Sequence, residues 1–133
     1  MVTIDENWIE AAISAQERAY VPYSSFSVGA CLVTNEDELI LAGNIENASY
    51  GLSNCAERTA FFKAISEGKY NFKALIISGE TEEPISPCGA CRQVMVEFCS
   101  SDMPVILIGK NRVRKETTVG ELLPYAFSKK DLN

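Results

Sequence analysis

The cysteine and histidine counts constrain this chain more than any other feature of its sequence. Five of the 133 residues are cysteine and none is histidine. A chain without imidazole cannot build a Ser-His-Asp triad or a histidine-ligated metal site. The cysteines are clustered and odd in number, and the first residues do not resemble an export signal. Such cysteines bind metal or perform chemistry more often than they form disulfides. The cysteines are therefore the first candidates for a functional site.

Length and charge restrict the remaining possibilities. A chain of 133 residues suits one domain, which we expect to span 1–133. Twelve basic against eighteen acidic residues give a net charge of -6, which opposes binding to nucleic acid or to an anionic membrane. The first residues, MVTIDENWIEAA, are acidic, and no apolar run approaches the roughly 20 residues that span a bilayer. We expect a cytoplasmic protein without nucleic-acid or membrane partners.

Periodicity and turn signals predict the order of helices and strands. Thr3 and Glu6 have the spacing of a capping box, so the first helix should start there and run to about Tyr20. The second helix should begin at Cys55 and end at Gly68. Strands are expected at 26–34 and 38–45, which form a hairpin, and at 72–78, 104–109 and 113–119.

A third helix is predicted after an acidic loop. Ser86 can cap it and Pro87 can occupy its first turn, with Val94, Val96 and Phe98 facing inward. A short helix or turn should follow at 121–127. The order α-β-β-α-β-α-β-β predicts an α/β fold with a single mixed β-sheet sandwiched by helices, in three layers α/β/α.

Three of the cysteines are predicted to meet at the starts of two helices. Cys88 and Cys91 are three residues apart and share a helix face, while Cys55 opens a different helix. Helix N-termini stabilise thiolates, and a thiolate cluster suits Zn²⁺. We expect Cys31 and Cys99 to be core residues, which leaves the fourth zinc position open to water, as in catalytic sites.

An open zinc site needs a base, and Glu57 is the candidate. It lies two residues after Cys55, on the same helical turn, so its carboxylate can face the metal. The alternative is that Glu57 caps its own helix, because Asn54 and Glu57 have the spacing of a capping box. Beside three cysteines, the base is the favoured interpretation.

A wider pattern surrounds these residues. C-A-E followed about thirty residues later by P-C-x-x-C is the zinc-deaminase signature, with cysteine in place of the usual histidine. The segments that extend it are PYSSFSVGA (22–30), GNIENASYG (43–51), NCAERTAFFKA (54–64), SPCGACRQV (86–94) and LLPYAF (122–127). Over nearly its whole length the chain resembles the small homotetrameric cytidine deaminases.

The resemblance implies an activity and an assembly. It implies a cytidine deaminase-like fold that deaminates free cytidine and deoxycytidine to uridine and deoxyuridine, with one Zn²⁺ per chain and Glu57 as proton shuttle. This is a reaction of pyrimidine salvage. The resemblance also implies a homotetramer with sites shared between subunits.

The resemblance further implies substrate-binding positions. Asn44 and Glu46 correspond to the pair that binds the ribose 3'-hydroxyl, and Phe26 to an aromatic wall against the base. The remaining positions are Ala56, Tyr50 and Phe127, of which Phe127 corresponds to a residue that reaches a neighbouring subunit's site. Without the resemblance, Phe26 is a core residue, Asn44 and Glu46 are solvated, and Phe127 is a loose tail residue.

Two arginines follow the cysteine ligands closely. Three thiolates leave Zn²⁺ with a formal charge of -1, which makes a bound water less acidic. Guanidinium hydrogen bonds from Arg58 and Arg92 to sulfur would withdraw that charge. Surface solvation is the alternative for both arginines.

Three other functions stay open at this stage. A deaminase of another aminated heterocycle, such as blasticidin S, would share the metal site without needing GNIEN. A nucleic-acid-editing deaminase would need a basic face, and a structural zinc module would need a fourth protein ligand. Glu46 bears on the second of these, since its carboxylate would repel a 3'-phosphate.

Overall fold

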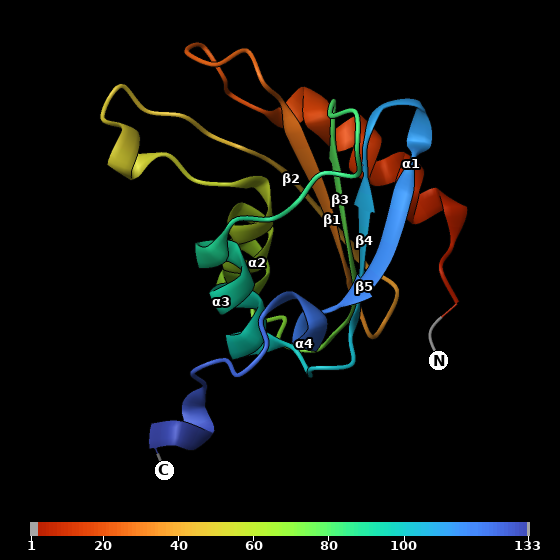
Figure 1. The fold of residues 1–133 in the computed structure, drawn as a ribbon, viewed down its shortest axis with the longest axis vertical. Coiled ribbons are helices and arrows are strands. Elements are labelled where there is room, and N and C mark those ends of the chain that lie inside the picture. Colours follow the sequence, from red (N-terminus) through yellow and green to blue (C-terminus); the bar gives the residue numbers. More distant parts are fainter. Residues whose placement is uncertain (1–2, 133) are drawn as a thin grey trace.

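The computed structural model describes residues 3–132, so residues 1, 2 and 133 of the predicted domain lie outside the described residues. Within 3–132 one five-stranded sheet runs through the middle of the molecule, in the order β2-β1-β3-β4-β5 (Figure 1). Its strands are β1 (Val28–Thr34), β2 (Leu39–Gly43), β3 (Phe72–Gly79), β4 (Pro104–Ile108) and β5 (Arg114–Thr118). Only β3 and β4 pair in parallel; the other neighbours are antiparallel. The predicted mixed sheet and its first hairpin are confirmed.

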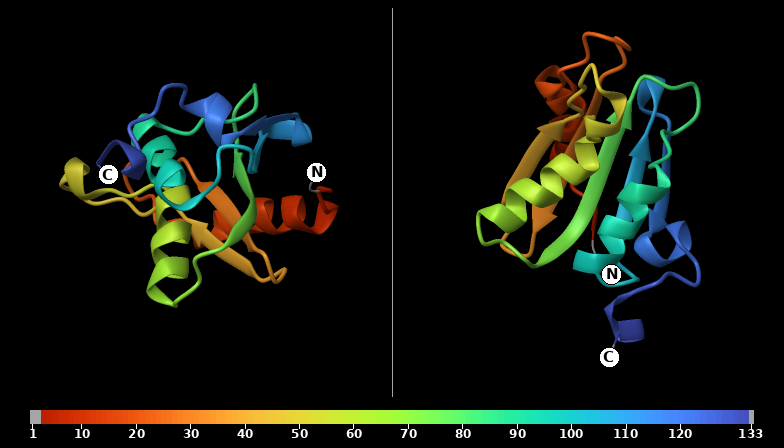
Figure 2. Two further views of the ribbon diagram at one scale, coloured as in Figure 1. Left: turned by 90° about the horizontal axis from the view of Figure 1, so that it is seen from below. Right: turned by 90° about the vertical axis from the view of Figure 1, so that its left-hand side faces the viewer.

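Helices cover both faces of the sheet (Figures 1 and 2). The helices are α1 (Glu6–Ser14), α2 (Ala56–Ser66), α3 (Gly89–Phe98) and α4 (Val119–Leu122), with 3₁₀ turns at Ala15–Arg18, Tyr50–Leu52, Lys110–Arg112 and Lys129–Leu132. Side chains alternate along β3, so Ala74 and Ile76 pack with α1 while Leu75 and Ile77 pack with α2 and α3. The three-layer α/β/α prediction is therefore confirmed. Within 3–132 no helix combines the length and apolar character that crossing a bilayer requires.

The first helix differs from its prediction at both ends. Its N-cap is Asp5, whose Oδ1 accepts from the Asn7 amide at 2.8 Å, and not Thr3. It also changes to a 3₁₀ turn after Ser14 instead of continuing to Tyr20. Here the backbone lies directly against the sheet, because a Cβ added at Gly29 would lie 2.2 Å from the carbonyl oxygen of Ala12. This close approach depends on tertiary packing, which helical periodicity does not reveal.

The two helices beside the metal centre both begin at a cysteine. Cys55 is the N-cap of α2, as predicted, but α3 is capped by Cys88 and not by Ser86. The Cys88 sulfur accepts from the Cys91 amide at 3.4 Å and so replaces the expected serine oxygen. On α3 the fully buried side chains are Cys91 and Met95. The residues predicted to face inward are only half buried against the same core, namely Val94, Val96 and Phe98.

Candidate metal centre

The predicted cysteines converge at one end of α2 and α3. The Sγ atoms of Cys55 and Cys88 are 3.8 Å apart, those of Cys88 and Cys91 are 3.3 Å apart, and all three lie within 4.8 Å of one another. Cys91 is buried, Cys55 is half buried and Cys88 is exposed. The cluster is therefore closed toward the core and open on the side of Cys88.

This geometry fits a tetrahedral zinc ion. Zinc–sulfur bonds of about 2.3 Å at tetrahedral angles place the sulfurs about 3.8 Å apart, close to the distances observed. A hydrogen bond from the Cys91 thiol and the Arg58 guanidinium both lower the pKa of Cys55, to about 5. The Cys91 thiol donates this hydrogen bond and is buried, and both effects raise the pKa of Cys91. The cluster already favours a thiolate at one position, and an all-sulfur donor set is one that zinc prefers.

The other two cysteines belong to the core, as predicted. Cys31 packs among apolar residues on the α1 side of the sheet, and Cys99 packs at the far end of α3. Burial raises the pKa of each thiol to about 12. The metal-ligating group found among residues 3–132 contains three cysteines and no fourth ligand.

Glu57 lies in the first turn of α2 with only 4 % of its surface exposed. Burial raises the pKa of its carboxyl, and the nearby Cys55 thiolate adds to the effect. The capping box of Asn54 and Glu57 does not form, because the N-cap of α2 is Cys55 and the side-chain amide of Asn54 donates instead to Thr59 Oγ1 at 3.4 Å. A hydrogen bond from its own backbone amide partly offsets the raised pKa of Glu57. A buried carboxyl with a raised pKa beside the ligands suits the transfer of protons near neutral pH.

The two arginines differ in what they contact. Arg58 Nη2 donates to Cys55 Sγ at 3.4 Å, which matches the predicted guanidinium–sulfur contact. All three guanidinium nitrogens of Arg92 donate instead to oxygen atoms, so the predicted contact between Arg92 and sulfur is wrong. Its acceptors lie on residues 86, 87 and 122, and Leu122 is 30 positions away in the chain.

A polar cavity of about 500 Å³ opens beside Cys55. Of the predicted site residues, the described lining includes Asn44, Glu46, Tyr50, Cys55 and Arg58. It also includes four residues that sequence reasoning missed, namely Tyr23, Ser24, Ser53 and Asn54. The first two lie in the PYSSF segment and the last two directly precede Cys55, so proximity to these motifs was the available signal.

Two side chains of the segment GNIEN, those of Glu46 and Asn44, hold the loop beside this cavity. Glu46 Oε1 accepts from the amides of Tyr23 and Ser24, each at 3.1 Å, and Oε2 accepts from Ser24 Oγ at 2.5 Å. The Ser24 hydroxyl makes the largest contribution to the lowered pKa of Glu46. Asn44 accepts from the Val28 amide at 2.9 Å and donates to the Phe26 carbonyl at 3.0 Å. Neither side chain is simply solvated.

Three of the predicted substrate-binding residues do not line this cavity, and neither do Glu57, Cys88, Cys91 and Arg92. Phe26 is 38 % exposed, and a Cβ added at Gly79 would lie 3.5 Å from its ring, so it is not an ordinary core residue. Ala56 is fully buried at the start of α2. Phe127 is 59 % exposed, and its carbonyl accepts from Gln93 Nε2 at 2.8 Å, which ties the tail to α3.

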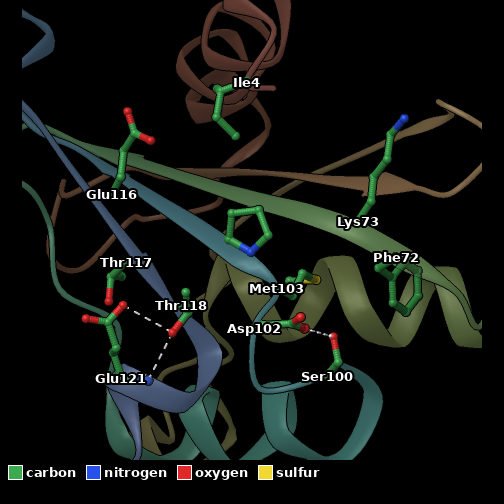
Figure 3. Close-up of a pocket in the computed structure, with 11 residues that line it drawn as sticks. Ile4, Phe72, Lys73, Ser100, Asp102, Met103, Glu116, Thr117, Thr118 and Glu121 are labelled. Carbon is green, nitrogen blue, oxygen red and sulfur yellow. Dashed lines mark hydrogen bonds between the residues drawn. The ribbon is translucent and has the colours of Figure 1, made fainter. Parts of the chain in front are cut away.

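A second cavity of about 490 Å³ lies where β3 and β4 begin (Figure 3). Of the described residues that line it, none is a cysteine. Asp102 accepts from Ser100 Oγ at 2.7 Å and Glu121 is paired with Thr118, while Lys73 forms an ion pair with Asp37 outside the cavity. Its polar groups are engaged with neighbours, so this cavity does not show the chemistry of the first.

The fold and the metal centre define a zinc-dependent deaminase, in which three cysteines can hold the metal and a buried carboxyl lies beside them. The family model "Cytidine and deoxycytidylate deaminase zinc-binding region" matches residues 2–107. The chain is 54% identical to the cytidine deaminase of Sporosarcina psychrophila, over 96% of this chain and 94% of that one. It therefore belongs to the cytidine deaminase family.

Two more comparisons place the chain within that family. A crystal structure of cytidine deaminase from Burkholderia pseudomallei superposes with a TM-score of 0.91 at 50% identity, covering 94% of this chain and all of that chain. The blasticidin-S deaminase of Bacillus cereus is 29% identical, over 95% of this chain and 96% of its own length. The predicted fold and the predicted zinc cofactor, one Zn²⁺ per chain, agree with these findings.

Proposed function

We propose that this chain hydrolyses free cytidine and deoxycytidine to uridine and deoxyuridine with release of ammonia. The observation that carries this proposal is the convergence of three thiols and the buried Glu57 next to a polar cavity large enough for a nucleoside. Zinc held by Cys55, Cys88 and Cys91 would supply a Lewis acid and an activated water. The proposed catalytic domain spans residues 1–133.

Glu57 is the proposed proton shuttle. Its carboxylate takes a proton from the attacking water and passes it to N3 of the cytosine ring, which makes C4 more electrophilic. After the C4–O bond forms, Glu57 carries the second proton to the amine, and the C4–N bond breaks to give ammonia. The raised pKa of the buried carboxyl allows it to accept and release protons in turn.

The nucleoside is proposed to lie with its ribose toward Asn44 and Glu46. Both side chains line the cavity beside Cys55, and Glu46 offers a carboxylate acceptor for the 3'-hydroxyl. The family resemblance assigns Phe26 and Ala56 to contacts with the base, although neither lines this cavity. Nothing in this cavity demands a 2'-hydroxyl, so deoxycytidine should serve as well.

The same carboxylate argues against larger substrates. A phosphate on the 3'-oxygen would lie next to the Glu46 charge, and the two negative groups repel. The net charge of -6 adds a weaker, screened repulsion toward any polynucleotide. Free nucleosides are therefore the proposed substrates, in pyrimidine salvage in the cytoplasm, without nucleic-acid or membrane partners.

We further propose a homotetramer in which subunits share sites. Tyr50 is 77 % exposed in one chain and lies on the segment that extends from the body in Figure 1, although it borders the cavity. Phe127 is also exposed and does not line the cavity of its own chain. Exposed aromatic side chains at such positions favour burial against another subunit.

The decisive experiment incubates zinc-loaded protein with each candidate substrate and follows the loss of cytosine absorbance and the release of ammonia. We expect rapid turnover of cytidine and deoxycytidine and almost none of 3'-CMP or single-stranded DNA. Glu46→Gln removes the charge but keeps the shape, so it should narrow the gap between cytidine and 3'-CMP. Efficient deamination of single-stranded DNA by the unmodified protein would overturn both the free-nucleoside substrate and the role of Glu46.

Blasticidin S is the competing substrate, because a relative at 29% identity is named for its deamination. Comparing turnover of cytidine and blasticidin S by the same preparation separates the two activities. Faster turnover of blasticidin S would replace the nucleoside proposal. A structural zinc module would instead bind zinc through four ligands and turn over neither compound.

A further inference from the structure

Arg92 lies in the first turn of α3, directly after the ligand Cys91, and all three of its guanidinium nitrogens are engaged. Nε donates to the Pro87 carbonyl at 2.9 Å, Nη2 to Ser86 Oγ at 2.8 Å, and Nη1 to the Leu122 carbonyl at 2.8 Å. A planar guanidinium can satisfy three such acceptors at once, whereas the single ammonium of lysine cannot reproduce this geometry.

Two of these acceptors directly precede Cys88. Cys88 is the exposed ligand: the Cys91 amide donates to its sulfur, and the Cys55 sulfur lies 3.8 Å from it. The chain before it, residues 80–88, forms a loop rather than a helix or strand. Arg92 holds Ser86 and Pro87, the two residues before Cys88, against α3 and so fixes the position at which Cys88 begins the helix.

The third acceptor belongs to the C-terminal region. Leu122 is the last residue of α4, and the chain continues from it to Phe127. The next residue on α3, Gln93, donates to the Phe127 carbonyl at 2.8 Å. Adjacent residues of one helical turn therefore hold the two ends of segment 122–127.

We infer that Arg92 is a positioning residue for the metal centre, which fixes Cys88 through residues 86 and 87 and joins the C-terminal segment to the metal-binding turn of α3. Its role differs from that of Arg58, which contacts a ligand sulfur itself. The two roles make opposite predictions for a lysine substitution. Charge compensation survives in Arg92→Lys, but simultaneous positioning of three oxygens does not.

The inference rests on zinc binding and on contacts within the chain, not on the identity of the substrate. The test measures release of zinc from the holoenzyme to a chromogenic chelator at neutral pH. Loss of a residue that orients a metal ligand typically costs about 10–100-fold in metal affinity. We expect Arg92→Lys to release zinc at least about tenfold faster than the unmodified protein, and Ser86→Ala, which removes one acceptor, to show a smaller increase in the same direction.

Backbone hydrogen exchange on the same proteins tests the second half of the inference. Arg92→Lys should speed exchange in both 84–90 and 120–128, whereas Gln93→Ala should do so only near 124–128 and leave zinc release unchanged. Arg114→Lys is the matched control, because Arg114 pairs with Glu6 and Glu116 on the outer strand. It should change neither measurement.

Three results would overturn the proposal or one of its two parts. If Arg92→Lys keeps zinc as long as the unmodified protein while Arg92→Gln loses it quickly, Arg92 acts through its charge. Unchanged exchange in 120–128 of Arg92→Lys would equally refute the link to the C-terminal segment. Should Arg92→Lys fold poorly, as judged by circular dichroism, Ser86→Ala decides, and zinc release at the unmodified rate then refutes the positioning of Cys88.

Discussion

The two cavities lie at opposite ends of one sheet and have nearly equal volumes, about 500 and 490 Å³. At the first, sulfurs from two helix starts converge and a buried carboxyl has a raised pKa. At the second, Asp102 and Glu121 are paired with hydroxyls of residues two or three positions away in the chain. Cavity size therefore does not mark the active end; converging ligands and a perturbed carboxyl do.

The same contrast runs along a single helix. Cys88 and Cys91 lie at the N-terminal end of α3, where their sulfurs meet that of Cys55 and the Cys91 amide donates to the Cys88 sulfur. Cys99 lies at the C-terminal end, where burial raises its pKa to about 12. Identical side chains eight and eleven residues apart thus have different surroundings: two meet a third sulfur and one packs in the core.

The largest expected effect separates these cysteines. Cys55→Ala, Cys88→Ala and Cys91→Ala should each lose zinc and all measurable activity, since two thiolates hold the ion far less tightly than three. Cys99→Ala and Cys31→Ala are matched controls that should keep both. Metal analysis of the purified proteins checks this, and one zinc per chain retained in Cys88→Ala would contradict it.

Glu57 and Asp102, which lie at opposite ends of the sheet, provide the next test of the comparison between these ends. Glu57→Gln should retain zinc and fold yet lose at least about a thousandfold in kcat, because one group serves two proton transfers that are each worth about 10²–10⁴. Asp102→Asn, at the second cavity, should leave kcat unchanged. Steady-state kinetics on cytidine measures both. If Glu57→Gln kept a tenth of normal kcat, another base would have to serve the reaction.

The sequence alone predicts those parts of the molecule that local patterns determine. Alternation and turn signals predicted the strands, and spacing placed Cys55, Glu57, Cys88 and Cys91 on two helix starts, where the structure has them. The family resemblance added residues in 43–51 that spacing alone left undecided.

Three of the errors share one cause, which is contact between residues distant in the chain. Arg92 was assigned to sulfur because it follows a ligand, but its acceptor Leu122 is 30 residues away. Ser24 was missed because its partner Glu46 lies 22 residues later. The early end of α1 reflects close packing of its backbone against Gly29. None of these contacts leaves a periodic trace in the sequence.

The C-terminal tail is expected to affect substrate binding at the active site of a neighbouring subunit. If Phe127 completes the site of another subunit, removing residues 127–133 should retain zinc but raise KM for cytidine by about tenfold or more, since burial of a phenylalanine is worth about 1.5–3 kcal/mol.

Mixed oligomers supply the control for this prediction. Truncated chains combined with full-length Glu57→Gln chains should recover part of the activity, because intact tails and intact Glu57 then meet at one site. A fully active monomer at the assay concentration would rule out the sharing of sites.

The smallest effect is expected at the second cavity, and it should fall on stability alone. Thr118 caps α4: its hydroxyl accepts from the Glu121 amide and lies near the Glu121 carboxylate, each at 3.2 Å. Thr118→Ala should cost about 1 kcal/mol of stability and lower Tm by roughly 3–5 °C. Thr118→Ser keeps the cap and should stay close to the unmodified Tm. Because this cap lies at the opposite end of the sheet from the ligands, kcat and zinc content at 25 °C should not change in either variant. A drop in kcat without loss of zinc would mean that the second cavity is coupled to the active end, and the contrast between the two ends would then fail.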